Sequence, residues 1–134
     1  MKGHARQLMT PNDVVVSPET TLAEAARELA RVEISGLPVS DSKGCVVGIV
    51  TESDLLGALL GTSPNNTTVQ ALMTSNIVTV DEFTPADHVL HLLREHRIHH
   101  LPVIRQGVVV GLITPQSVIQ YFVTHELPSP PEAA

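Results

Sequence analysis

Apolar residues recur at helical spacing in two segments of the chain, and each segment stands in the same order of predicted elements. The helical stripes are Leu22, Ala25, Ala26 and Leu29 in the first half, and Ala86, Val89, Leu90 and Leu93 in the second. This i, i+3, i+4, i+7 spacing is typical of an amphipathic helix. The flanking apolar segments are β-rich stretches at 14–16 and 77–80, hairpins at 37–50 and 101–113, and closing helices at 55–60 and 118–123. The pattern predicts the order β-α-β-β-α twice, which is an α/β fold class.

Local signals predict where the helices begin. Short helical turns are expected at 5–9 and 69–73, ahead of each unit. Thr20 or Thr21 is predicted to cap the first long helix. The run Thr84-Pro85-Ala86-Asp87 predicts a capping box for the second one, with proline at its first helical position.

The two halves are also an internal repeat. QLMT at 7–10 recurs as ALMT at 71–74, an offset of 64 residues. A one-residue deletion in the second hairpin lowers the offset to 63 and aligns GIVTESD at 48–54 with GLITPQS at 111–117. Such self-similarity predicts two copies of one structural unit. We place the first repeat at 1–64, the second repeat at 65–126, and a Pro-rich tail that is expected to be disordered at 127–134.

Composition narrows the class of protein. Of 134 residues, 43% are hydrophobic and 2% aromatic, which predicts a packed, aliphatic core. The net charge is −6 and no run of Lys or Arg occurs, so we expect neither nucleic acid nor an anionic membrane as a partner. Cys45 is the single cysteine, which excludes an internal disulfide. No apolar stretch resembles a membrane span or a secretion signal, so a cytoplasmic protein is expected.

The order of these motifs resembles a tandem pair of cystathionine-β-synthase (CBS) domains. The motifs that carry the resemblance are LMTP at 8–11, SGLPV at 35–39, GIVTESD at 48–54 and HHLPV at 99–103. The resemblance implies a pseudo-twofold pair of units with sheets facing and helices outside, and a homodimer. It also implies clefts that bind an adenosine-containing ligand such as AMP, ADP, ATP or S-adenosylmethionine. Such a stand-alone module regulates an effector protein, here unknown, and has no catalytic residues and no cofactor.

The segment Thr51-Glu52-Ser53-Asp54 permits two interpretations. The pattern is typical of a capping box, which only satisfies the first amides of a helix. The same helix start can bind a phosphate through its amides, and a carboxylate one turn in can accept ribose hydroxyls. The resemblance assigns the ribose to Asp54, with Thr51 and Ser53 beside it. In the second repeat Thr114 remains but Ser117 replaces the aspartate, so we expect a weakened or empty second cleft, or a site that never bound a ligand.

Five of the seven histidines fall between residues 88 and 100. The resemblance implies that His99 and His100 reach ligand phosphates and share a cleft with Thr51 and Asp54. Phosphate binding there would depend on pH, because imidazole titrates near neutrality; the alternative is a pair of surface histidines. Ile49, Val78 and Ile98 are candidates for the apolar walls of this cleft, and the alternative for each is a residue of the core. The second cleft is expected to combine Thr114 and Ser117 with Val14, Ser35 and Gly36.

Two other classes of function stay open. In a structural adaptor, the apolar helices 55–60 and 118–123 would mediate dimerisation or docking, and no ligand would matter. In a metal-dependent hydrolase, His88 and His91 would bind a metal with His96 or Glu95. No Cys partner or H-E-x-x-H spacing supports that metal site, so a solvated helix face is favoured and no metal is expected.

Overall fold

The structure, a computed structural model, describes residues 1–12, 14–32, 34–61 and 64–128. Residues 129–134 of the predicted tail lie outside this range. In chain order the elements are α1 Ala5–Leu8, β1 Thr10–Pro11, α2 Leu22–Val32, β2 Gly36–Ser40, β3 Val46–Thr51, α3 Glu52–Leu59, α4 Val69–Leu72, β4 Val80–Asp81, α5 Ala86–Glu95, β5 Leu101–Arg105, β6 Val108–Ile113 and α6 Pro115–His125. The predicted hairpins and amphipathic helices are confirmed. The β-rich stretches are shorter than expected, since 14–16 contributes one bridge and 77–80 ends in β4.

The two halves form separate sheets that share one strand topology. In the first half, β2 and β3 form an antiparallel hairpin, and single bridges at Val16–Val39 and Ile49–Thr74 flank it. In the second half the order is β1-β6-β5-β4, with β4 parallel to β5 and β1 antiparallel to β6. Each hairpin thus gains one parallel and one antiparallel neighbour. The repeat seen in the sequence is therefore a repeat of strand topology.

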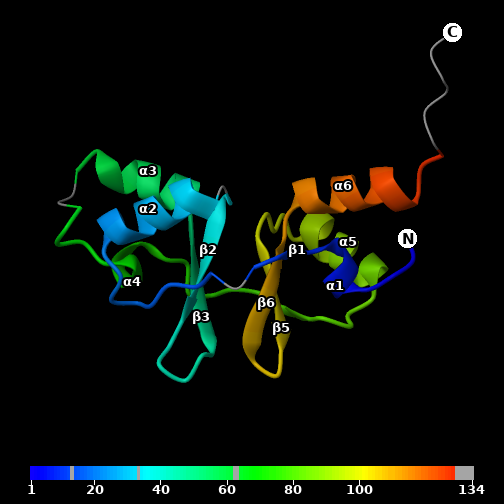
Figure 1. The fold of residues 1–134 in the computed structure, drawn as a ribbon, viewed down its shortest axis with the longest axis horizontal. Helices are drawn as coiled ribbons and strands as arrows, with labels where there is room; N and C mark the ends of the chain where they lie inside the picture. The colour runs from blue at the N-terminus through cyan, green and yellow to red at the C-terminus, as the bar shows by residue number, and fades with distance from the viewer. Residues whose placement is uncertain (13, 33, 62–63, 129–134) are drawn as a thin grey trace, which may run out of the picture.

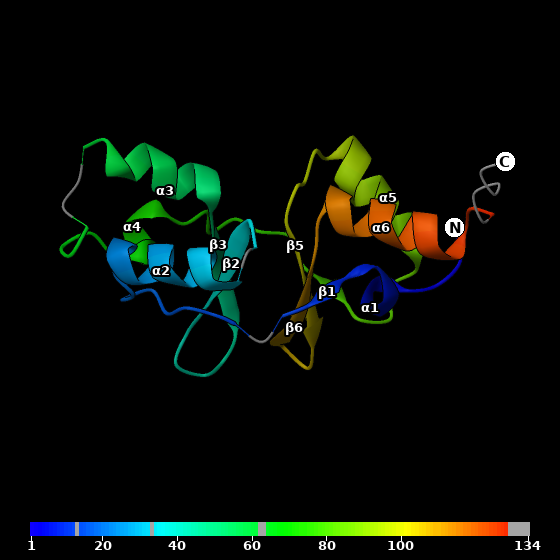
Figure 2. The ribbon, with the colours of Figure 1, turned by 45° about the horizontal axis from the view of Figure 1, so that its top comes forward.

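The two sheets meet in the middle of the molecule and the helices lie outside them. α2 and α3 flank the β2–β3 hairpin, and α5 and α6 flank the β5–β6 hairpin (Figure 1; Figure 2). Helices on one face of each sheet leave the other faces opposed. This arrangement confirms the predicted fold class and the facing sheets. No helix within the described residues is long and apolar enough to span a membrane.

The leading helix of each repeat packs in the other half. Ala5 and Leu8 of α1 belong to the core of the second half, which includes Val103 and Ile113. Val69 of α4 belongs to the core of the first half. Backbone hydrogen bonds fix the exchange, from Ala5 N to Thr84 O at 2.8 Å and from Val69 N to Thr20 O at 2.7 Å. The core of the second half is consequently completed by α1, which leads the first repeat, and the core of the first half by α4, which leads the second repeat.

One predicted cap is present and the other is wrong. Thr21 and Glu24 form a reciprocal capping box at the start of α2, with Glu24 N donating to Thr21 Oγ1 at 3.1 Å. The second long helix begins at Ala86 with Pro85 as N-cap and no side-chain cap. Thr84 is held in the preceding loop instead, because its N–H bonds Asp81 and its carbonyl accepts from α1.

Candidate functional site

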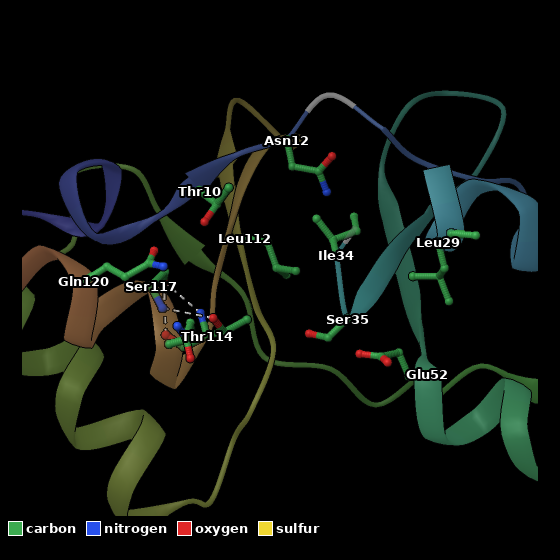
Figure 3. A pocket seen from close by; sticks show the side chains of 12 residues that line it. Thr10, Asn12, Leu29, Ile34, Ser35, Glu52, Leu112, Thr114, Ser117 and Gln120 are labelled. Carbon is green, nitrogen blue, oxygen red and sulfur yellow. Dashed lines mark hydrogen bonds between the residues drawn. The ribbon is translucent and has the colours of Figure 1, made fainter. Parts of the chain in front are cut away.

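A cleft of about 790 Å³ lies between the two halves (Figure 3). Volumes of this size suit small organic ligands, which usually occupy about 300–1,000 Å³. One wall comes from α2, the turn before β2 and the start of α3, and the other comes from β1, β6 and α6. The lining residues are Thr10, Asn12, Leu29, Ala30, Ile34, Ser35, Glu52, Leu112, Thr114, Gln116, Ser117 and Gln120. The cleft therefore exists only when both repeats are folded together.

The start of α6 opens into this cleft. Thr114 is the N-cap, and its Oγ1 accepts from Ser117 N at 3.1 Å while Thr114 N donates to Ser117 Oγ at 3.0 Å. The Ser117 hydroxyl donates in turn to the Thr114 carbonyl at 3.0 Å and is only 6% exposed. Serine thus replaces the aspartate of the first repeat without loss of the capping box. It leaves this helix start without a carboxylate of its own.

The equivalent start of α3 has the predicted capping box. Asp54 Oδ2 accepts from Thr51 N at 2.9 Å and from Thr51 Oγ1 at 3.0 Å. Asp54 N donates back to Thr51 Oγ1 at 3.3 Å. Among the described residues no hydrogen bond to Oδ1 of Asp54 is present, so one carboxylate oxygen stays available.

His100 crosses from the second half to the first. Its Nε2 lies 2.7 Å from Ser35 Oγ, in a hydrogen bond between the halves. Burial lowers the pKa of His100 below its ordinary value of 6.5, and the charge of His99 lowers it further, whereas Glu52 and Asp54 act in the opposite direction. The carboxylates of Glu52 and Asp54, both in the first turn of α3, therefore act on the charge of this imidazole.

Asn12 is a lining residue that the sequence interpretation missed. It is 7% exposed, and its Oδ1 accepts from Val14 N at 2.8 Å. Its Nδ2 is buried and has no hydrogen-bond partner among the described residues. Figure 3 shows this amide nitrogen pointing into the cleft, toward Ile34 and Leu112. The signal in the sequence was that asparagine recurs at the same place in both repeats, as Asn76.

Of the site residues predicted from the sequence, some of those expected in the second cleft line the cavity, and those expected in the first cleft do not. Three residues expected in the second cleft line the cavity, namely Thr114, Ser117 and Ser35. Val14 packs against the first core, and Gly36 is buried against His100. None of the residues expected in the first cleft lines this cavity. Those residues are Ile49, Thr51, Ser53, Asp54, Val78, Ile98, His99 and His100.

The remaining apolar residues of that set occupy different environments. Ile49 is 6% exposed in β3, and Ile98 packs against the second core. Val78 is 43% exposed. Within the described part of the chain, no group of three His, Cys, Asp or Glu side chains is placed to hold a metal ion.

Comparison with known proteins gives a relative and two ligand complexes. L-Aspartate semialdehyde sulfurtransferase of Methanocaldococcus jannaschii is 30% identical over 118 residues, which is 87% of this chain and 23% of that protein. The chain thus spans about a quarter of the length of that relative.

Two similar solved structures hold adenosine compounds. CBSX2 in complex with AMP has a TM-score of 0.76 and 28% identity, over 91% of this chain and 98% of that one. The CBS domain pair of protein MJ0100, in complex with 5′-methylthioadenosine and S-adenosyl-L-methionine, has a TM-score of 0.77 and 27% identity, over 94% and 100% of the two chains.

The family model of the CBS domain matches the chain twice. The matched residues are 5–61 and 69–124, one copy for each repeat found in the sequence. These limits agree with the strand topology that the two halves share and with the cleft that they enclose. The chain belongs to the CBS domain family, as a tandem pair of the domain.

Proposed function

We propose that the chain is a regulatory module that binds an adenosine-containing ligand between its two repeats. The observation that carries the proposal is the cleft of about 790 Å³, walled by both repeats, into which the start of α6 opens. The solved CBS pairs that hold AMP or S-adenosyl-L-methionine support the ligand class. A ligand that touches both repeats stabilises their mutual orientation, which is a signal that a partner protein can read.

The lining of the cleft matches the two chemical faces of an adenosine. Leu29, Ile34 and Leu112 offer apolar surface on which a base can pack. Thr10 and Gln120 offer neutral hydrogen-bonding groups on the wall that β1 and α6 form. Because aromatic residues are only 2% of the chain, the base has to pack between aliphatic side chains.

The pseudo-symmetric side of the molecule supplies a second candidate site. Here Oδ1 of Asp54 accepts a ribose hydroxyl, while Thr51, Ser53 and the amides at the start of α3 face a phosphate. His99 and His100 approach the phosphate from the other repeat. Ile49, Val78 and Ile98 form the apolar wall.

The output of the module is proposed to pass through protein contacts. α3 and α6 carry apolar side chains that face solvent in this chain, with Leu56 64%, Leu59 53%, Ile119 60% and Val123 56% exposed. We assign this surface to a homodimer, within the cytoplasm, that presents the ligand-bound module to an effector protein. The module itself catalyses no reaction in this proposal.

The same exposed surface favours one alternative function, a structural adaptor. In that case α3 and α6 dock a second chain, and the cleft has no physiological ligand. An adaptor and a sensor differ in one measurable property. Only the sensor is stabilised by an adenosine compound, since a ligand bound to the native state raises the unfolding midpoint.

A thermal-shift panel tests the proposal directly. The ligands are AMP, ADP, ATP, S-adenosylmethionine and adenosine, measured on the wild-type chain and on Asp54→Ala. A rise in the unfolding midpoint with at least one ligand is expected, and a smaller rise in Asp54→Ala assigns that ligand to the α3 side. An unchanged midpoint with every ligand would reject the sensor and leave the adaptor.

A further inference from the structure

Among the described residues that line the cleft of Figure 3, one carries a charge, and that charge is negative. Glu52 is the only ionisable side chain among the described residues that line the cleft, and Figure 3 shows its carboxylate facing the cavity. It stands at the first position of α3, where its backbone N–H donates to the Ser35 carbonyl at 3.0 Å. A phosphate in this cleft would meet this carboxylate, with no Lys or Arg among the described lining residues to offset it, and like charges repel.

The repeat makes this charge specific to one side of the molecule. Pro115 occupies the position in the second repeat that Glu52 occupies in the first. In the same way, Ser35 and Gly36 stand where the second repeat has His99 and His100. The α6 side therefore has a lining carboxylate, and the imidazole that reaches it, His100, is held by Ser35 Oγ at 2.7 Å and has a lowered pKa. The two sides thus differ in the charged groups that they offer to a ligand.

Asn12 adds a polar group that lacks a partner in the described part of the chain. Its orientation is fixed, because Oδ1 has to face the Val14 N–H at 2.8 Å. The Nδ2 donor is consequently directed into the cleft, where it is buried and unpaired. A buried donor without an acceptor is unfavourable. An acceptor supplied by a ligand between Ile34 and Leu112 would satisfy it.

We infer that this cleft selects adenosine derivatives that carry no phosphate, such as the nucleoside or its 5′-thioether. Asn12 Nδ2 donates to a ring nitrogen of the base, and the Glu52 carboxylate accepts from a ribose hydroxyl. Leu29, Ile34 and Leu112 surround the apolar part of the ligand. The inference rests on the proposed function, and it assigns different ligand classes to the two sides of one molecule.

Titration calorimetry with 5′-methylthioadenosine and with AMP tests the selectivity. The variants are Asn12→Asp, which keeps an acceptor for the Val14 N–H, removes the donor and adds a carboxylate, and Glu52→Gln, which removes an exposed charge. We expect Asn12→Asp to weaken 5′-methylthioadenosine roughly tenfold, the effect of one lost hydrogen bond that leaves an unpaired group. Glu52→Gln is expected to improve AMP binding at this site.

Matched controls come from the repeat and from the surface. Asn76→Asp makes the same substitution at the equivalent exposed position, and Glu19→Gln removes an exposed charge elsewhere. Neither is expected to alter 5′-methylthioadenosine binding. A thermal melt of each variant establishes that it is folded. Because Glu52 is exposed, we expect Glu52→Gln to fold normally. Its effect on AMP binding therefore still tests the inference if Asn12→Asp unfolds the chain.

The possible outcomes distinguish a failure of this inference from a failure of the proposed function. If 5′-methylthioadenosine binds but neither Asn12→Asp nor Glu52→Gln alters either ligand, the inference is wrong and the proposed function stands. If Asn12→Asp weakens 5′-methylthioadenosine but Glu52→Gln leaves AMP binding unchanged, the cleft binds adenosine without the selectivity inferred. If no adenosine compound binds the wild-type chain, the proposed function fails together with the inference.

Discussion

Ser35 and His100 join the two repeats through one hydrogen bond, with 2.7 Å between Oγ and Nε2 across 65 residues of sequence. Ser35 precedes β2 and His100 precedes β5, so the bond links the entries of the two hairpins. Gly36 makes room for the imidazole, since a Cβ there would stand 2.9 Å from His100 Cδ2. The contact thus joins Ser35, which lines the cleft, to an imidazole on which the charges of Glu52 and Asp54 act.

The first prediction concerns stability against pH. The pKa of His100 is lowered in the folded chain by burial and by His99, against the opposing carboxylates of Glu52 and Asp54. The folded state therefore binds fewer protons at His100 than the unfolded state does. The contribution of His100 to the free energy of unfolding is fully present above its unfolded pKa of about 6.5. This contribution is lost as the pH falls from there through the lowered pKa of the folded state.

The measurement is the unfolding midpoint of wild type and His100→Gln between pH 7.5 and 5.5. Glutamine does not titrate and can keep a hydrogen bond to Ser35, so the variant should lose less stability on acidification. His88→Gln, on the exposed face of α5, is the control for the loss of a histidine that contacts neither Ser35 nor Gly36. Equal pH slopes for wild type and His100→Gln would contradict the assignment.

A second prediction follows from the close approach of Gly36 to His100. Gly36→Ala places a methyl group against a ring that is wedged between the two halves, so the ring has to move. Overpacking of this kind typically costs about 1–3 kcal/mol of unfolding free energy. In a His100→Ala background the same substitution should cost much less. Urea unfolding of the four chains measures the coupling, and additive effects would show that the two residues do not interact.

The sequence predicted those parts of the fold that rest on short-range patterns. The hairpins and the amphipathic helices follow from apolar spacing, and the caps at Thr51 and Thr114 follow from local motifs. The exchange of α1 and α4 could not be predicted in this way. Ala5 meets Thr84 through a backbone hydrogen bond, and no local pattern at either residue signals the other.

The residues of the candidate site could be predicted only where they belong to a recognisable sequence motif. Thr114 and Ser117 were found because they align with a Thr-x-x-Asp motif. Asn12 in Thr-Pro-Asn is typical of a turn residue, and its burial depends on the partner repeat that closes over it. Glu52 was passed over as part of the capping segment, although its side chain faces the opposite repeat across the cleft.

The third prediction is that the α3 side binds a nucleotide more tightly at pH 6 than at pH 8. A bound phosphate favours the charged imidazole and raises the lowered pKa of His100, so binding takes up a proton. Calorimetry with AMP at the two pH values measures the change. The phosphate of AMP also titrates near pH 6, so the reference is the His99→Ala, His100→Ala double variant. A pH profile that is the same in this variant would remove the histidines from the phosphate site.

The fourth prediction concerns the apolar surface of α3 and α6. Ile119→Glu places a charge on a side chain that is 60% exposed in the isolated chain and is assigned to the dimer contact. A buried charge without a partner is strongly unfavourable, so the variant should be monomeric where the wild type is a dimer. Light scattering after size-exclusion chromatography gives the mass. Val108→Glu, on β6 and 52% exposed, is the control; a dimer that survives Ile119→Glu would place the interface elsewhere.

The last prediction tests the exchange of leading helices. Leu8 is 1% exposed and packs in the second core, although it lies in the first repeat of the sequence. Leu8→Ala should cost about 2–5 kcal/mol of unfolding free energy, the usual range for a buried leucine. Local opening should increase in the half that loses the contact. Hydrogen exchange is therefore expected to speed up in β5 and β6 more than in β2 and β3.

The matched substitution is Val69→Ala on α4, which should reverse that pattern because Val69 is fully buried in the first core. Leu60→Ala serves as the surface control, since Leu60 is 92% exposed and contributes little to either core. Faster exchange confined to β2 and β3 in Leu8→Ala would mean that α1 supports its own repeat. The reciprocal result instead makes each half dependent on the other, so that a ligand between them acts on one cooperative unit.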